Sequence, residues 1–137
     1  MTVSDAPSRT TCAALGRTAT VLIQGVPVQV PCPSWCTVDH AAENLAFLED
    51  LHHAGNSLSL PVTQYSGAVE HILVTQVCQW PYEGQHGNKG QPYLSIDADG
   101  SGECNGYAAA GALALIDQLV THAEAIRQQL RTLGSIQ

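Results

Sequence analysis

The residues best suited to chemistry lie in one run, Pro31-Cys32-Pro33-Ser34-Trp35-Cys36-Thr37-Val38-Asp39-His40. The run places two thiols and one imidazole within nine residues. Thiolates and imidazoles are the donors that proteins use to bind zinc tetrahedrally. The pair His52-His53 follows, 12 and 13 residues after His40. We therefore predict a zinc site built around this run.

Three of these donors can meet through local geometry alone. Cys32 and Cys36 are separated by three residues, and Pro31 and Pro33 stiffen the turn between them because proline restricts the backbone and donates no helical hydrogen bond. Cys36 and His40 are four residues apart, so one helical turn would bring both side chains to the same face. The spacing therefore predicts that Cys32, Cys36 and His40 approach one another.

A fourth donor is harder to place, because a short helix is expected over Ala41–Leu51, capped by Asp39. An unbroken helix would hold His52 and His53 roughly 18–20 Å from His40, too far to share one ion. Either the chain doubles back within this segment, or the fourth ligand is another group. The remaining candidates are His71, Cys78, Cys104 and a water molecule.

The segment resembles an uncharacterised actinobacterial family, found mainly in Streptomyces and relatives, whose members carry a Cys-Pro-x-Trp-Cys-x3-His signature and a later His-x-Gly. The matching stretches are Val30-Pro31-Cys32-Pro33-Ser34-Trp35-Cys36 with Asp39-His40, and Leu51-His52-His53-Ala54-Gly55. The family also has short strands and an Ala/Leu-rich C-terminal helix, and the resemblance covers roughly residues 20–130. It implies four metal ligands: Cys32, Cys36, His40 and, rather than His52, His53. The family has no assigned activity, so the resemblance implies a fold and a metal site but no reaction.

Four protein ligands would leave the metal no open position, whereas catalytic zinc needs one. We therefore predict a structural zinc site in a small binding or adaptor domain of unknown process, and do not expect an enzyme. Two other functions stay open. One is a zinc enzyme that uses only three of the ligands, and the other is a thiol redox switch in which Cys32 and Cys36 form a disulfide. The alternative without chemistry is a pair of buried free cysteines beside Trp35.

A second pattern resembles half of a calcium loop. Asp97, Asp99 and Ser101 stand where the first, third and fifth positions of an EF-hand loop would be, and Gly102 stands at the sixth. The twelfth position is Ala108, where a bidentate glutamate is required. We expect a glycine-rich connection here and not a calcium site.

Composition bears on the class of partner. The formal charge is −7 and the five basic residues are scattered, whereas a nucleic-acid binder usually carries a basic patch. No stretch approaches the ~20 apolar residues of a membrane span, and the N-terminus lacks the features of a signal peptide. We expect a cytoplasmic protein with reduced thiols that binds neither nucleic acid nor membrane but an unknown protein partner.

The elements that must position the site indicate an α+β fold. One domain is expected over residues 18–134, after a flexible tail over 1–17. Short segments that are β-branched or that alternate apolar and polar residues predict strands over 18–24, 26–30, 57–62, 71–80 and 92–96. We expect three to five short strands in a small antiparallel sheet, with a long C-terminal helix packed on one face.

The C-terminal helix is the clearest element. Its apolar positions alternate four and three residues apart, and they are Ala112, Ile116, Leu119, Ala123, Ile126, Leu130 and Leu133. A helix from about Gly106 to Leu133 would be about 40 Å long, more than a small sheet can cover. Either it breaks near Gly111 or its end projects. The chain is accordingly expected to be a monomer, or a homodimer that pairs through the projecting stripe.

Overall fold

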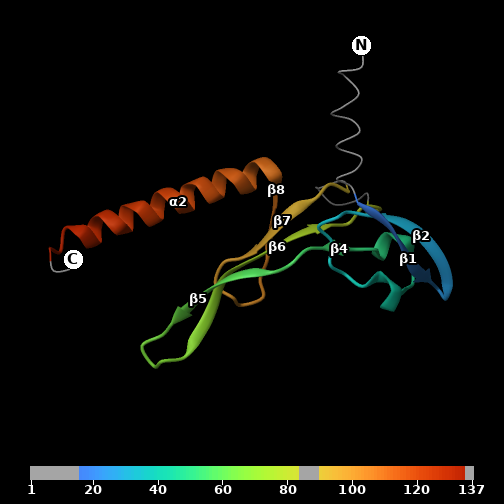
Figure 1. The fold of residues 1–137 in the computed structure, drawn as a ribbon, viewed down its shortest axis with the longest axis horizontal. Coiled ribbons are helices and arrows are strands. Elements are labelled where there is room, and N and C mark those ends of the chain that lie inside the picture. The colour runs from blue at the N-terminus through green and yellow to red at the C-terminus, as the bar shows by residue number, and fades with distance from the viewer. Residues whose placement is uncertain (1–15, 84–89, 135–137) are drawn as a thin grey trace, which may run out of the picture.

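The computed structural model describes residues 16–83 and 90–134. They form two small sheets, of three and five strands, and one long C-terminal helix, α2 (Ala109–Arg131) (Figure 1). The predicted α+β class is therefore confirmed, with the strands divided between two sheets. The predicted tail, residues 1–17, lies outside the described residues except for its last two.

The first sheet is a hairpin with a short third strand. It contains β1 (Arg17–Ile23), β2 (Val26–Cys32) and β3 (Asn44–Leu45), in the order β2-β1-β3. The hairpin closes through Gln24 and Gly25, whose φ angles of 49° and 80° give the turn a twist that matches its antiparallel strands. β3 adds to the other edge of β1 in parallel.

The core of this sheet is small. Val21 and Val30, on facing strands, are buried together with Leu51. Partly buried side chains surround them, namely Ala19, Ile23, Val28, Leu45 and Leu48. A core of this size contributes little apolar burial, so the sheet depends on contacts with its surroundings.

The second sheet is antiparallel and is organised around one long strand. It contains β4 (His53–Ala54), β5 (Leu58–Thr63), β6 (Val69–Gln79), β7 (Tyr93–Asp97) and β8 (Asn105–Ala108). Along one edge β6 pairs with β5 near its start and with β4 at its end, and it also pairs with β7, which pairs with β8. The strand β6 therefore connects both ends of this sheet.

A bend interrupts β6 at Leu73. This residue has a φ of 50°, which is uncommon for a side chain other than glycine, and its N–H donates to the Ala98 carbonyl at 3.0 Å. The loop after β7 lies against the same stretch, because a Cβ added to Gly100 would be 2.3 Å from the His71 carbonyl oxygen. Pairing with β5 also shifts register here, between Leu58 and Leu60.

The helix α2 contacts β7 and β8, and Ala112 is buried there. It starts at Ala109 because residues 105–108 form β8. Beyond its first turns the helix leaves β7 and β8, and its C-terminal end projects past the sheet (Figure 1). Of the two outcomes that the sequence allowed, a broken helix and a projecting end, the structure has the projecting end. Within the described ranges, no helix has the length and apolarity that a bilayer crossing requires.

The helix predicted over Ala41–Leu51 is wrong. The segment forms two 3-10 helices, η2 (His40–Ala42) and η3 (Leu48–Asp50), with β3 between them. Long-range hydrogen bonds decide the outcome: the Gln24 N–H donates to the Leu45 carbonyl at 2.8 Å, and the Gly25 N–H donates to Asn44 Oδ1 at 3.0 Å. The segment therefore doubles back, as a shared metal site requires.

Candidate metal centre

Four donor side chains meet where the two sheets come together. Cys32, Cys36, His40 and His53 are all buried, and their ligand atoms all lie within 4.8 Å of one another. Cys32 ends β2, Cys36 follows in the next turn, His40 opens η2 and His53 begins β4. The structure thus brings together the four residues that the resemblance implied.

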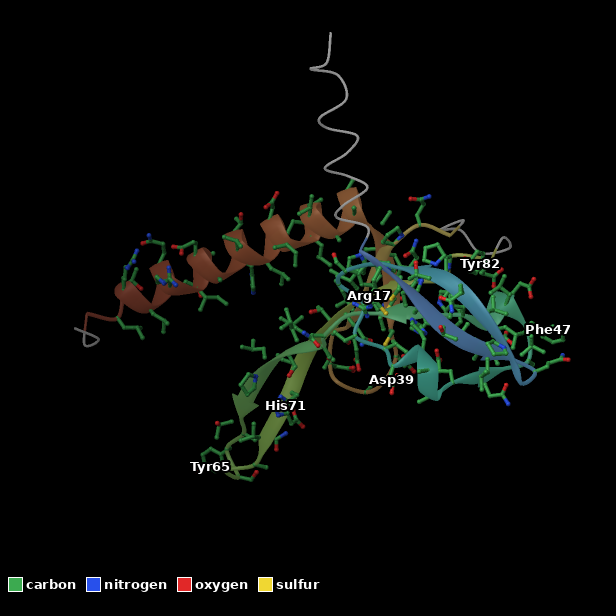
Figure 2. All side chains as sticks on the ribbon, turned by 45° about the vertical axis from the view of Figure 1, so that its right-hand side comes forward. Arg17, Asp39, Phe47, Tyr65, His71 and Tyr82 are labelled. Carbon is green, nitrogen blue, oxygen red and sulfur yellow. The ribbon has the colours of Figure 1, made fainter. Side chains whose placement is uncertain are left out.

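Backbone hydrogen bonds hold the cysteine turn in place. The Cys36 N–H donates to the Pro33 carbonyl at 3.1 Å, and the Thr37 N–H donates to the Ala54 carbonyl of β4 at 2.8 Å. Arg17, at the start of β1, donates from Nη2 to the Cys36 carbonyl at 3.0 Å. Figure 2 shows Arg17 and Asp39 in this region, apart from Tyr65 at the tip of the hairpin. The turn is therefore attached to both sheets.

Two separations between donor atoms match those of a tetrahedral zinc shell. Cys36 Sγ lies 3.5 Å from His40 Nε2, and that nitrogen lies 3.2 Å from His53 Nδ1. Zinc bonds of about 2.3 Å to sulfur and about 2.0 Å to nitrogen, at tetrahedral angles, separate S and N by roughly 3.5 Å and two N atoms by roughly 3.3 Å. Both separations agree with these values, and all four donor atoms lie within 4.8 Å of one another, so the cluster could hold a metal ion such as zinc.

The two histidine rings are oriented by hydrogen bonds on their outer sides. His40 Nδ1 lies 2.6 Å from Glu43 Oε1, which leaves Nε2 for the cluster. The His53 ring bonds to the backbone of Pro31, whose carbonyl is the only hydrogen-bonding group that a proline backbone offers. A carboxylate or carbonyl partner on the far nitrogen is typical of metal-binding histidines.

Burial also sets the protonation of the donors. Burial and the neighbouring His40 lower the pKa of His53 to about 4, so the ring is neutral at neutral pH and can act as a ligand. Burial and the hydrogen bond with Cys36 raise the pKa of the Cys32 thiol, against the opposing charge of Arg17. A thiol with a raised pKa is a poor nucleophile, which disfavours thiol catalysis by Cys32.

The other candidates for a fourth ligand lie elsewhere. His52 stacks on Trp80, with ring centroids 4.2 Å apart and planes 27° from parallel. His71 is exposed and contacts Ser59 Oγ at 2.9 Å. Cys78 is buried within β6, and Cys104 is exposed.

Trp35 covers the cluster from one side. Its ring meets the His53 ring edge to face, with centroids 6.4 Å apart. The backbone carbonyl of Trp35 also approaches Gly55, where an added Cβ would lie 3.2 Å away. The tryptophan therefore packs against the His53 side of the site.

The calcium-like loop uses its carboxylates to bind its own backbone. Asp97 accepts the Gly100 N–H on Oδ1 at 2.9 Å and the Gly102 N–H on Oδ2 at 2.8 Å. Asp99 accepts the Ser101 N–H at 3.0 Å. The geometry supports the predicted glycine-rich connection.

The sequence did not reveal two residues that support the cluster. Glu43 lies within the segment that the sequence predicts as a helix, and Arg17 is the last residue of the predicted tail. The position of Glu43 three residues after His40 was the available signal, since a short helical turn brings such residues together. Nothing in the sequence pointed to Arg17, because its partner is a backbone carbonyl 19 residues away.

We expect Glu43→Ala to weaken metal affinity by roughly 10-fold or more without unfolding the domain, because the His40 ring loses the partner that orients it. Competition with a chromophoric chelator measures the affinity. Glu49→Ala is the matched control, since Glu49 is exposed on η3. Equal affinities for the two variants would exclude a role for Glu43.

No curated protein and no solved structure matches the chain. The family described as Domain of unknown function (DUF6907) matches residues 16–134. That range includes both sheets, α2 and the four clustered side chains. The chain therefore belongs to this family, whose function is unknown.

Proposed function

We propose that this chain is a zinc-binding interaction domain in which the metal is structural. The observation that carries the proposal is the burial of two thiols and two imidazoles with ligand atoms within 4.8 Å of one another. Two cysteines and two histidines make a closed shell of the kind found in structural zinc sites. Two thiolates would also neutralise the ion, which favours its burial.

The position of the cluster supports a structural role. Cys32 belongs to the first sheet and His53 to the second, so one ion bound to both would join the sheets. The first sheet has a small core, centred on Val21, Val30 and Leu51. A metal that binds only the folded state adds its binding free energy to the stability of the fold. The first sheet, with its small core, would be stabilised most by this contribution.

The two alternative chemistries have less support. A zinc enzyme needs an open position on the metal, and here four buried donors surround the site. Glu43, the acidic side chain that contacts the cluster, is bound to His40 and is not available to activate water. A redox switch would need accessible thiols of low pKa, whereas Cys32 and Cys36 are buried.

The binding role is supported by the uncovered apolar side chains of α2 and of the hairpin β5–β6. Exposed apolar surface of this extent marks interaction sites in folded proteins. A protein partner for this surface is part of the proposal, and the metal site serves to hold the fold that presents it.

Metal analysis of the full chain, combined with X-ray absorption at the metal edge, tests the proposal. We expect one zinc per chain, with two sulfur ligands at about 2.3 Å and two nitrogen ligands at about 2.0–2.1 Å. A shell with three protein ligands and a water would favour an enzyme. A metal-free protein that forms the Cys32–Cys36 disulfide under mild oxidation would favour the redox switch.

A further inference from the structure

Apolar side chains remain uncovered on two neighbouring elements, the helix α2 and the hairpin β5–β6. Both extend to the same side of the molecule, away from β1 and β2 (Figures 1 and 2). On and just beyond α2 the exposed residues are Leu113, Ile116, Val120, Ile126, Leu130 and Leu133. On the hairpin they are Leu58, Leu60, Val62 and Val69.

A groove lies between these two elements. Leu60 and Leu73 line it from the strands, and Ile116, Leu119, Ala123 and Ile126 line it from α2. Its volume is about 380 Å³. A second hollow of about 330 Å³ continues along the helix toward Ala109, between Leu113 and Val77. We call the first of these the α2 groove.

The uncovered surface is large enough for a stable interface. Val69 pairs with Thr63 and so lies on the opposite face of the hairpin from Leu60 and Val62. The other nine residues expose on the order of 800 Å², compared with roughly 300–600 Å² for the largest apolar patch of a typical monomer. A specific interface of standard size buries about 800 Å² on each partner. A partner that covered this face would therefore bury the area that a specific complex needs.

We propose that the occupant of this surface is a second copy of the chain, with the α2 helices of the two copies packed against each other along the α2 groove. The proposal deepens the binding role above and rests on it. The apolar positions of α2 alternate four and three residues apart from Ala112 to Leu133, the spacing with which one helix packs along another of the same repeat.

Symmetry makes a second copy a better fit than a single foreign helix. Each chain offers both a projecting apolar helix and a groove that lacks a covering element. Two copies related by a two-fold axis would cover each helix and each groove at once, since the same patch meets itself in such a dimer.

The charge distribution of α2 is compatible with this partner. The helix contains two acidic residues, Asp117 and Glu124, and two basic residues, Arg127 and Arg131, so it is neutral overall. Glu124 and Arg127 form an ion pair on an exposed part of α2. The net charge of −7 therefore does not lie on the helix, and neither repulsion between two copies nor attraction of a basic protein is built into it.

The mass of the zinc-loaded full chain in solution, measured by light scattering and by sedimentation over a range of concentrations, tests the proposal. We expect a dimer, twice the chain mass of 14.5 kDa. Ile126→Glu and Leu130→Glu should each raise the dimer dissociation constant by roughly 100-fold or more, because an unpaired carboxylate would be buried at the contact. Gln128→Glu, off the apolar stripe on the same helix, adds the same charge and should leave the dimer intact.

Zinc content and far-UV circular dichroism, measured on every variant, separate assembly from folding and from the metal site. Zinc-loaded Ile126→Glu or Leu130→Glu that is monomeric with an unchanged spectrum supports the proposal. A wild-type chain that holds zinc but stays monomeric at all concentrations overturns the dimer and leaves the metal site standing. Dimers that persist in both stripe variants, or that dissociate equally in Gln128→Glu, also overturn it.

Discussion

Replacing Cys36 with serine should abolish stoichiometric zinc binding and lower the free energy of unfolding by several kcal/mol. Cys36 Sγ lies 3.5 Å from His40 Nε2 within the buried cluster, and a serine hydroxyl is a poor replacement for a thiolate ligand. Structural zinc contributes about 10–16 kcal/mol of binding free energy in zinc-finger peptides. The loss of a part of that in this domain corresponds to a fall in melting temperature of more than about 10 °C.

Thermal melts with and without a chelator separate the loss of metal from a packing defect. The wild-type chain in chelator should melt near the temperature of Cys36→Ser, and the variant should respond to neither chelator nor added zinc. Cys104→Ser is the control, because Cys104 is a free and exposed cysteine. A Cys36→Ser protein with the same melting temperature as the wild type would exclude a metal role for the cluster.

Metal removal should loosen the first sheet before the second. The four ligands connect β2 to β4, and apart from them the first sheet has only a small core around Val21, Val30 and Leu51. The ladder between β6 and β7 contains none of the four ligands. We therefore expect chelation to speed amide exchange in β1 and β2 by at least about 10-fold, while β6 and β7 change far less.

Hydrogen exchange followed by mass spectrometry measures the amide exchange rate of each strand. His53→Ala should reproduce the exchange pattern of the chelated protein. His52→Ala is the matched neighbour, since it removes only the ring that stacks on Trp80. Equal loosening of both sheets, or the same pattern in both variants, would contradict the view that the metal joins the two sheets.

The donor set was predictable from the sequence, but the choice between the two adjacent histidines was not. Neighbouring residues on a strand point to opposite faces. His53 begins β4 and turns toward the cluster, whereas His52 turns to Trp80. That choice depends on the register of β4 against β6, in which His53 pairs with Gln79. Only the family resemblance favoured His53 over His52 as the fourth ligand.

The predicted zinc site and the predicted helix over Ala41–Leu51 were incompatible, and the helix is the one that does not form. Local propensity could not show this, because the reason lies in contacts with distant residues. Asn44 and Leu45 pair in parallel with β1, residues far away in the chain. Such pairing outweighs a helix of eleven residues, which is marginal without tertiary support. The C-terminal helix was predictable for the opposite reason, because its periodic stripe is a local property of the sequence.

The bend at Leu73 has a consequence for how the two surfaces of the domain are connected. The strand β6 is 11 residues long, about 36 Å at the usual rise of a strand. Its C-terminal end pairs with β4 beside the metal centre, and its N-terminal end belongs to the hairpin that borders the α2 groove. The bend at Leu73 divides this strand into two parts. The part beyond Leu73 pairs with β7, with β4 and with Leu58 of β5, while the part before it pairs with the rest of β5. The tilt of the hairpin against the helix, and with it the width of the groove, therefore depends on the backbone around Leu73, where β5 shifts register and the loop after β7 makes contact.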